Sequence, residues 1–151
     1  MYKKVLVGVD ESQDAMDAVK KALELKKRDN SNVVVFYSVM HDLSEFTPSI
    51  SFSGASNVSI SYLIHEDHVN KGKKILEEIQ KLFNNEDQKV ETRLIFDTPP
   101  EDYIKKITEE ENFDLVILGC KGKHSKLKRT FLGTIPDKVI NNAPCDVLIV
   151  R

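Results

Sequence analysis

Five short apolar runs constrain the fold of this chain more than any other feature of its sequence. Three of them, VLVGV, VVVFYSV and VLIV, are almost uninterrupted by polar residues. A strand with one face in water alternates apolar and polar residues, whereas a strand covered on both faces is apolar throughout. The runs therefore predict buried strands of a parallel sheet, and they occupy Val5–Val9, Val33–Val39, Val90–Phe96, Leu115–Leu118 and Val147–Val150.

Segments with helical periodicity separate these runs. Ser12 is suited to cap the first helix, and Thr98 to cap the third with Pro99 in the first helical position. The second helix is predicted to end at Asn84, and the fourth to begin at Thr134. The positions expected to face the core are Ala15, Val19, Ala22, Leu23, Ile75, Leu76, Ile79, Leu82, Phe83, Ile104, Ile107, Val139 and Ile140.

The resulting order βαβαβαβαβ predicts an α/β fold with right-handed crossovers, in a single domain over residues 1–151. One stretch, His41–Ser61, does not fit this pattern, because its seven serines, one proline and one glycine are typical of a surface loop. It follows the second strand, so we expect it at the carboxyl end of the sheet, where open α/β folds bind ligands. A lid over such a site and an insertion without a role are both compatible with this composition.

Charge and composition exclude several classes of protein. A formal net charge of -2 argues against global electrostatic binding to nucleic acid or to an anionic membrane. No apolar run approaches the about 20 residues that span a bilayer, and the first run is too short for a signal peptide. The two cysteines, Cys120 and Cys145, cannot form a disulfide framework. The sequence therefore predicts a cytoplasmic protein that binds neither nucleic acid nor membrane.

The segment from Leu118 to Thr134 carries the strongest signal for chemistry. It leaves a buried strand, holds five cationic residues between positions 121 and 129, and enters a helix at Gly133-Thr134. Glycines can adopt positive φ and let the backbone approach an anion, and the N–H groups at a helix start bind phosphate oxygens. The segment is not a Walker loop, because it lacks GxxxxGK[ST]. It predicts a phosphate-binding loop, with a solvated basic loop as the alternative.

These segments together resemble the universal stress protein family along the whole chain. The ATP-binding branch of that family carries the pattern G-x2-G-x9-G-[S/T], which Gly119, Gly122 and Gly133-Thr134 match except that ten residues separate Gly122 from Gly133. Asp97-Thr98-Pro99 also departs from the family, which usually has a glycine before that proline. Other matching residues are Val7-Gly8-Val9-Asp10-x-Ser12, Thr98-Pro99-Pro100-Glu101-Asp102, Phe113–Gly119 and Ala143–Val150.

The resemblance implies an open five-stranded sheet of order 3-2-1-4-5 with helices on both faces. It also implies a stress-response regulatory or sensor protein that binds ATP, with Mg²⁺ or Mn²⁺ on the phosphates, at the carboxyl ends of the first and fourth strands. Asp10 would face the ribose or adenine, and Val9, Val39 and Met40 would border the adenine. The phosphates would lie against Gly119, Gly122, Gly133 and Thr134.

Two other functions remain open from the sequence. The first is a nucleotide-free, dimeric interaction module of the same family, which the longer glycine spacer favours. The second is a weak ATPase or a phosphoryl-transfer enzyme using Cys120 or Asp10, although no residue is clearly placed as a general base. The C-x5-R motif of a phosphatase would need arginine where Lys126 stands. His65 and His68 have helical spacing but no evident third metal ligand.

The last apolar run predicts self-association. In the order 3-2-1-4-5, Val147–Val150 is an edge strand, and it contains neither lysine nor proline to discourage pairing. Two such edges meeting about a twofold axis would close the assembly at two copies. We therefore expect a homodimer through this strand, as the family resemblance also implies, while the identity of any downstream protein partner is left open.

Overall fold

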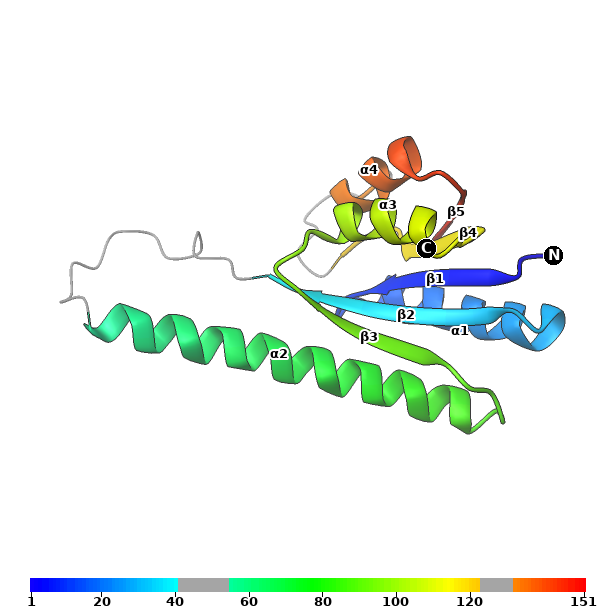
Figure 1. Cartoon of the computed structure of the whole chain (residues 1–151). Coiled ribbons are helices and arrows are strands. Elements are labelled where there is room, and N and C mark those ends of the chain that lie inside the picture. The colour runs from blue at the N-terminus through cyan, green and yellow to red at the C-terminus, as the bar shows by residue number, and fades with distance from the viewer. Residues whose placement is uncertain (41–54, 123–131) are drawn as a thin grey trace.

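Five parallel strands form a single sheet in the order β3-β2-β1-β4-β5, and helices cover both of its faces (Figure 1). The computed structural model describes residues 1–40, 55–122 and 132–151, and for residues 55–62 it describes the backbone alone. The strands are β1 (Lys4–Val9), β2 (Asn32–Val39), β3 (Glu91–Phe96), β4 (Leu115–Gly119) and β5 (Asp146–Val150). The helices are α1 (Gln13–Asp29), α2 (Ala55–Asn84), α3 (Pro100–Glu110) and α4 (Thr134–Asn142). The predicted fold class and strand order are confirmed.

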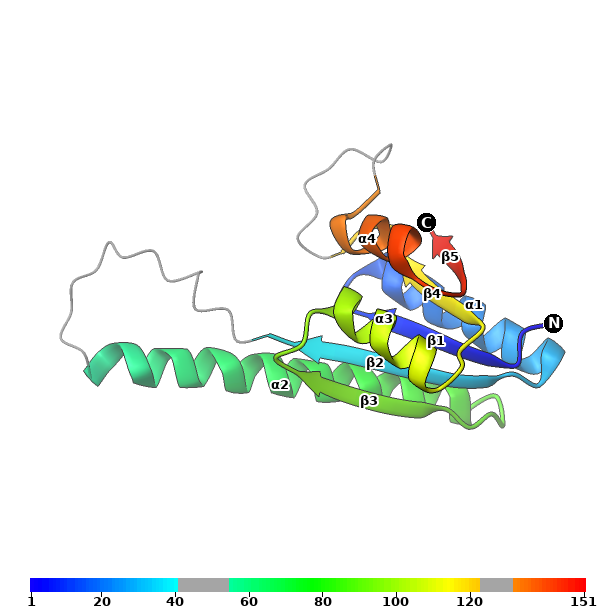
Figure 2. The same cartoon turned by 45° about the horizontal axis from the view of Figure 1, so that its top comes forward.

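Two cores lie on opposite faces of the sheet. Helices α1 and α2 pack against one face, and α3 and α4 against the other (Figure 2). Val7 and Val35 face the first core, whereas Leu6 and Phe36 face the second, which is why the strand runs lack polar alternation. Ile140 was expected in the core but is 48% exposed. The residues of the nine-residue helix α4 that face the core are Pro136 and Val139. Ile140, one position further on, therefore lies off this buried face.

The cap of α1 is confirmed and that of α3 is not as predicted. Ser12 accepts a hydrogen bond from the backbone N–H of Ala15 at 3.2 Å, as an N-cap residue should. At α3 the N-cap is Pro99 and the helix begins at Pro100. The ring of Pro100 disfavours helical backbone at Pro99, which therefore stays extended with ψ 136°. The hydroxyl of Thr98 donates instead to the carbonyl of Phe96 at 3.2 Å.

Helix α2 begins earlier than expected and extends past the sheet. Its first residue is Ala55, so residues 55–61 are helical, contrary to the prediction of an irregular stretch, while residues 41–54 lie outside the described part. Serine lowers helix propensity only mildly, and the sequence of this segment has neither glycine nor proline to stop the helix. With 30 residues, α2 is about 45 Å long, against about 26 Å for β2, and its first half projects beyond the strands (Figure 1). None of the helices, within the described ranges, is long and apolar enough to cross a membrane.

A charged network ties β1, β3 and the end of α3 together. Arg93 forms a bidentate pair with Glu111, with Nη1–Oε1 and Nη2–Oε2 distances of 2.6 and 3.0 Å. Lys4 Nζ lies 2.9 Å from Glu111 Oε2 and also contacts the ring of Phe113. These hydrogen bonds, from Arg93 first and Lys4 second, lower the pKa of Glu111 from 4.5 to about 2. The same pairing raises the pKa of Arg93.

This network predicts acid-sensitive stability. Because the folded pKa of Glu111 is depressed, its contribution is complete above about pH 4.5 and is lost as the pH falls toward about 2. We expect Glu111→Gln to lower the free energy of unfolding at pH 7 by about 1.5–3 kcal/mol, the range for a hydrogen bond to a charged group. The same change should make the free energy of unfolding, measured by urea denaturation, depend less on pH between about 4.5 and about 2. In contrast, Glu110→Gln, which alters an exposed neighbour 3.9 Å from Lys106, should shift stability by less than about 0.5 kcal/mol.

Candidate functional site

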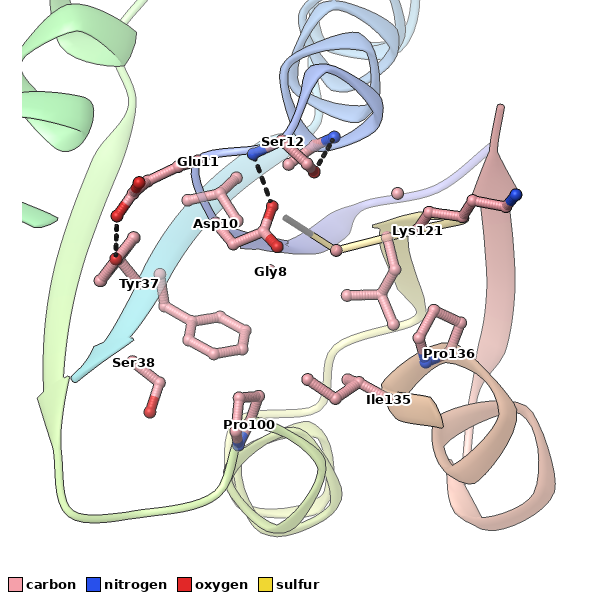
Figure 3. Close-up of a pocket in the computed structure, with 16 residues that line it drawn as sticks. Gly8, Asp10, Glu11, Ser12, Tyr37, Ser38, Pro100, Lys121, Ile135 and Pro136 are labelled. Atoms are coloured by element: carbon pink, nitrogen blue, oxygen red, sulfur yellow. Dashed lines mark hydrogen bonds between the residues drawn. The ribbon is translucent and has the colours of Figure 1, made fainter. Parts of the chain in front are cut away.

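A cavity of about 240 Å³ opens at the carboxyl ends of β1, β2 and β4 (Figure 3). The sequence order of the strands reverses between β1 and β4, and the helices that follow these two strands cover opposite faces of the sheet. Connections that leave in opposite directions open a crevice between them, which is where α/β sheets of this kind bind ligands. The first turns of α3 and α4 close the cavity on the side opposite α1.

The lower part of the cavity is apolar. Phe36 and Leu118 line the cavity from strands β2 and β4 and make up its floor. Pro100, Ile135 and Pro136 line it from the helix starts, where Ile135 is 37% exposed (Figure 3). Phe36 is held by the ring of Tyr103, with 4.7 Å between the ring centroids. These surfaces suit a flat, weakly polar group such as a heterocyclic base.

Gly8 is essential to this floor, although the sequence reasoning did not assign it a role. A Cβ atom at Gly8 would lie 2.7 Å from Cδ2 of Leu118 and 3.2 Å from the ring of Phe36. The absence of a side chain therefore lets these two residues approach each other beneath the cavity. The available signal was a glycine inside an otherwise apolar strand, which often marks such a close approach.

The upper part of the cavity is polar. Asp10 Oδ1 accepts a hydrogen bond from the N–H of Ser12 at 2.9 Å, which orients the carboxylate at the start of α1. The hydroxyl of Tyr37 donates to Glu11 Oε1 across 3.4 Å. Burial, and then the charges of Asp10 and Asp67, raise the pKa of Tyr37, so this phenol stays protonated at neutral pH. The site thus combines fixed carboxylates with an apolar slot.

Close packing, rather than unusual dihedral angles, accounts for the glycines at positions 119, 122 and 133. A Cβ at Gly119 would lie 2.7 Å from the backbone of Asp14 and Ala15, and one at Gly122 would lie 2.8 Å from Asp10 Oδ2. Gly133 has φ -68°, which any residue can adopt, but a Cβ there would lie 2.9 Å from the carbonyl of Cys120. The expectation that these glycines adopt positive φ is wrong, because no described glycine does so.

Positive φ occurs instead at Asp97, with a value of 51°. This residue follows β3 and lies in the turn where the family pattern has a glycine. Aspartate tolerates the left-handed region better than most residues, so the turn is retained without glycine. The hydroxyl of Ser38 braces this turn by donating to the carbonyl of Thr98 at 2.7 Å.

The structure brings some of the predicted site residues together and separates others. Residues 9, 10, 119 and 122 all line the cavity. Val39 is only 1% exposed and packs in the core, and Met40 is 38% exposed; the β2 residues known to line the cavity are Phe36, Tyr37 and Ser38. Gly133 and Thr134 immediately precede two wall residues of α4. Within the basic segment Lys121 lines the cavity, and residues 123–131 lie outside the described part.

The other candidate chemistries find less support. Cys120 is 1% exposed, and its backbone N–H and carbonyl are both used, by Val150 and Gly133. Burial raises the pKa of Cys145, which makes its thiolate less available. No group of three His, Cys, Asp or Glu side chains able to hold a metal ion occurs in the ranges that the structure describes.

Comparison with known proteins assigns the chain to a family. The model of the universal stress protein family matches residues 1–151, the whole chain. The chain belongs to the universal stress protein family. Among curated relatives, universal stress protein MJ0531 of Methanocaldococcus jannaschii is 29% identical over 151 residues, which cover 100% of this chain and 83% of that protein.

Solved structures support the same fold. Universal stress protein UspA from Lactobacillus plantarum superposes with a TM-score of 0.81 at 22% identity, covering 99% of this chain and 98% of that one. The structure of the hypothetical protein MJ0577 superposes with a TM-score of 0.80 at 25% identity, covering 99% of this chain and 96% of that one. Two similar structures contain a bound nucleotide. A universal stress protein in complex with cAMP has a TM-score of 0.63 and 22% identity, covering 99% of this chain and 97% of that one. The universal stress protein from Archaeoglobus fulgidus in complex with dAMP has a TM-score of 0.64 and 18% identity, covering 99% of this chain and 98% of that one.

Proposed function

We propose that this protein binds an adenine nucleotide, ATP, in the cavity at the carboxyl ends of β1 and β4, and that it acts as a stress-response regulatory or sensor protein. The observation that carries the proposal is the pairing of an apolar slot with the Asp10 carboxylate at the crevice of the sheet. That members of the same family were solved with cAMP and dAMP supports an adenine ligand.

The charges in the cavity favour one orientation of the nucleotide. The adenine would lie against Phe36 and Ile135, and the ribose hydroxyls would donate to Asp10, since a carboxylate only accepts hydrogen bonds. The phosphates would lie toward the backbone of Lys121 and Gly122 and the start of α4, where a helix carries partial positive charge.

A divalent cation fits this proposal only through the phosphates. Since the described residues offer no three-residue ligand cluster, Mg²⁺ or Mn²⁺ would be held chiefly by the nucleotide itself, and would neutralise phosphate charge. Of the carboxylates known to line the cavity, Asp10 accepts a hydrogen bond from Ser12 and Glu11 accepts one from Tyr37, so each already has a structural partner. We therefore propose reversible binding as the main activity, with hydrolysis slow at most.

Removing the Asp10 carboxylate should weaken nucleotide binding. We expect Asp10→Ala to reduce ATP affinity about tenfold or more, the effect of losing a hydrogen bond to a charged group. Isothermal titration calorimetry measures this loss, and Asp102→Ala, which removes an exposed carboxylate on α3, is the matched control. Equal ATP affinities of the two folded variants would contradict the proposed role of Asp10. As a second measurement, denaturing the purified protein and identifying any released nucleotide shows whether it carries one from the cell.

We also propose that the protein forms a homodimer through β5, the edge strand of the sheet. The N–H of Cys120 donates to the carbonyl of Val150 at 2.7 Å, so the backbone of Val150 faces β4. Backbone groups alternate sides along a strand, which directs the N–H groups of Val147 and Ile149 toward the open edge. These donors are available to an antiparallel copy of the same strand.

Proline at position 149 should dissociate this dimer. It removes an outward donor and leaves the β4–β5 hydrogen bonds in place, whereas Ile149→Ala shortens the side chain and keeps the donor. Sedimentation velocity should show a shift toward monomer for Ile149→Pro and a dimer for Ile149→Ala. A wild-type protein that sediments as a monomer at tens of micromolar would overturn the dimer proposal.

A further inference from the structure

Three hydrogen bonds fix the backbone that enters the phosphate side of the cavity. The N–H of Cys120 donates to Val150 at 2.7 Å, and its carbonyl accepts from Gly133 at 3.0 Å. The third bond runs from the N–H of Lys121 to Oδ2 of Asp14, at 3.1 Å. The first two join backbone to backbone, so Asp14 is the one side chain among these three anchors.

Asp14 can act on the cavity through this backbone without lining the cavity itself. It belongs to the first turn of α1, and its main chain packs against Gly119 so closely that a Cβ there would lie 2.7 Å from the Asp14 carbonyl carbon. Unlike Asp10, Asp14 is not among the residues that line the cavity, whereas Lys121 and Gly122, which it positions, are. No direct contact with a bound nucleotide is therefore needed for Asp14 to influence binding.

We propose that Asp14 is a positioning residue that sets Lys121 and Gly122 for the phosphates of the nucleotide. This inference rests on the proposed function and deepens it, because it separates the phosphate end of the site from the adenosine end. The adenosine end depends on the floor and on Asp10, neither of which the Asp14–Lys121 bond holds. Loss of the bond should therefore weaken ATP and leave adenosine nearly unaffected.

The sign of the effect separates positioning from simple electrostatics. A carboxylate near the phosphate end repels ATP, so if Asp14 acted only as a charge, both Asp14→Asn and Asp14→Ala would tighten ATP binding. If Asp14 acts as an anchor, Asp14→Asn keeps an oxygen that can accept from Lys121, and Asp14→Ala does not. Positioning thus predicts weaker binding for the alanine variant alone.

The experiment compares ATP and adenosine binding by calorimetry in the wild type and these two variants. We expect Asp14→Ala to bind ATP about tenfold more weakly, as for the loss of one hydrogen bond, with adenosine affinity within about twofold of wild type. Asp14→Asn should restore ATP affinity to wild-type level or above. An unchanged ATP-to-adenosine ratio in Asp14→Ala, or tighter ATP binding by it, would overturn the inference while leaving the proposed function intact.

A second measurement tests the anchor without any nucleotide. Amide hydrogen exchange followed by NMR should show Lys121 protected in the wild type and in Asp14→Asn, and exchanging at least about tenfold faster in Asp14→Ala. Equal exchange of the Lys121 amide in all three proteins would overturn the anchor itself. Absence of both ATP and adenosine binding by the folded wild type would instead refute the proposed function, and the inference with it.

Discussion

Truncating Phe83 to alanine is expected to lower the free energy of unfolding by about 3–5 kcal/mol, the range for deleting a buried aromatic side chain. Phe83 is fully buried near the end of α2, where it packs with Leu76 and Ile79 between the helix and the sheet. Its loss leaves a cavity in the first core that the rigid sheet cannot fill. Chemical denaturation, followed by circular dichroism, measures the change.

The matched control for this prediction lies on the same helix. Leu63→Ala removes an apolar side chain that is 62% exposed, in the first half of α2. We expect this variant to change stability by less than about 0.5 kcal/mol, as is usual for surface substitutions. A loss at Leu63 as large as that at Phe83 would show that the first half of α2 is packed as firmly as the second, contrary to the structure.

Gly119→Ala is expected to destabilise the fold by about 1–3 kcal/mol, the cost of overpacking a close contact. Its Cβ would meet the backbone N of Ala15 and the carbonyl carbon of Asp14, each at 2.7 Å. Backbone atoms cannot rotate away as a side chain can, so α1 must shift relative to β4. Because both elements border the cavity, the same change should weaken ATP binding more than about tenfold.

Gly122→Ala should weaken ATP binding without the loss of stability expected for Gly119→Ala. Among the residues that the structure describes, a Cβ at position 122 would approach the end of the Asp10 side chain, at 2.8 Å, and a side-chain carboxylate shifts more readily than backbone does. We therefore expect stability within about 0.5 kcal/mol of wild type, together with weaker ATP binding because Asp10 is displaced. If Gly119→Ala were as stable as Gly122→Ala, the close contact between β4 and α1 would not exist in solution.

The sheet was predictable from the sequence because strands buried on both faces are apolar along most of their length. Runs such as residues 33–39 have no polar alternation, and their short length and β-branched valines favour a strand over a buried helix segment. The start of α2 was not predictable in this way. The serines of residues 55–61 are more typical of turns and loops than of helix interiors, so composition favoured a loop where the structure has a helix.

The candidate site was predicted in part. Asp10 and Gly119 could be placed at the crevice because strand ends in a parallel sheet meet at one edge, whereas Gly122 was placed there by the family resemblance. Phe36 and Ile135 were missed, since an apolar residue that lines a cavity has the same pattern as one that fills a core. The Asp14–Lys121 bond joins residues 107 positions apart, and only the fold brings them together.

An NMR titration of isotopically labelled protein with ATP tests the central claim most directly, because it reports both binding and its location. Binding in the cavity predicts saturable shifts of the amide signals of Gly8, Asp10, Tyr37 and Gly119. The signals of Glu111 and its partners, at the amino ends of the strands, should stay unchanged. An absence of shifts at millimolar ATP, or shifts confined to residues away from the cavity, would contradict the claim that this crevice is an adenine nucleotide site.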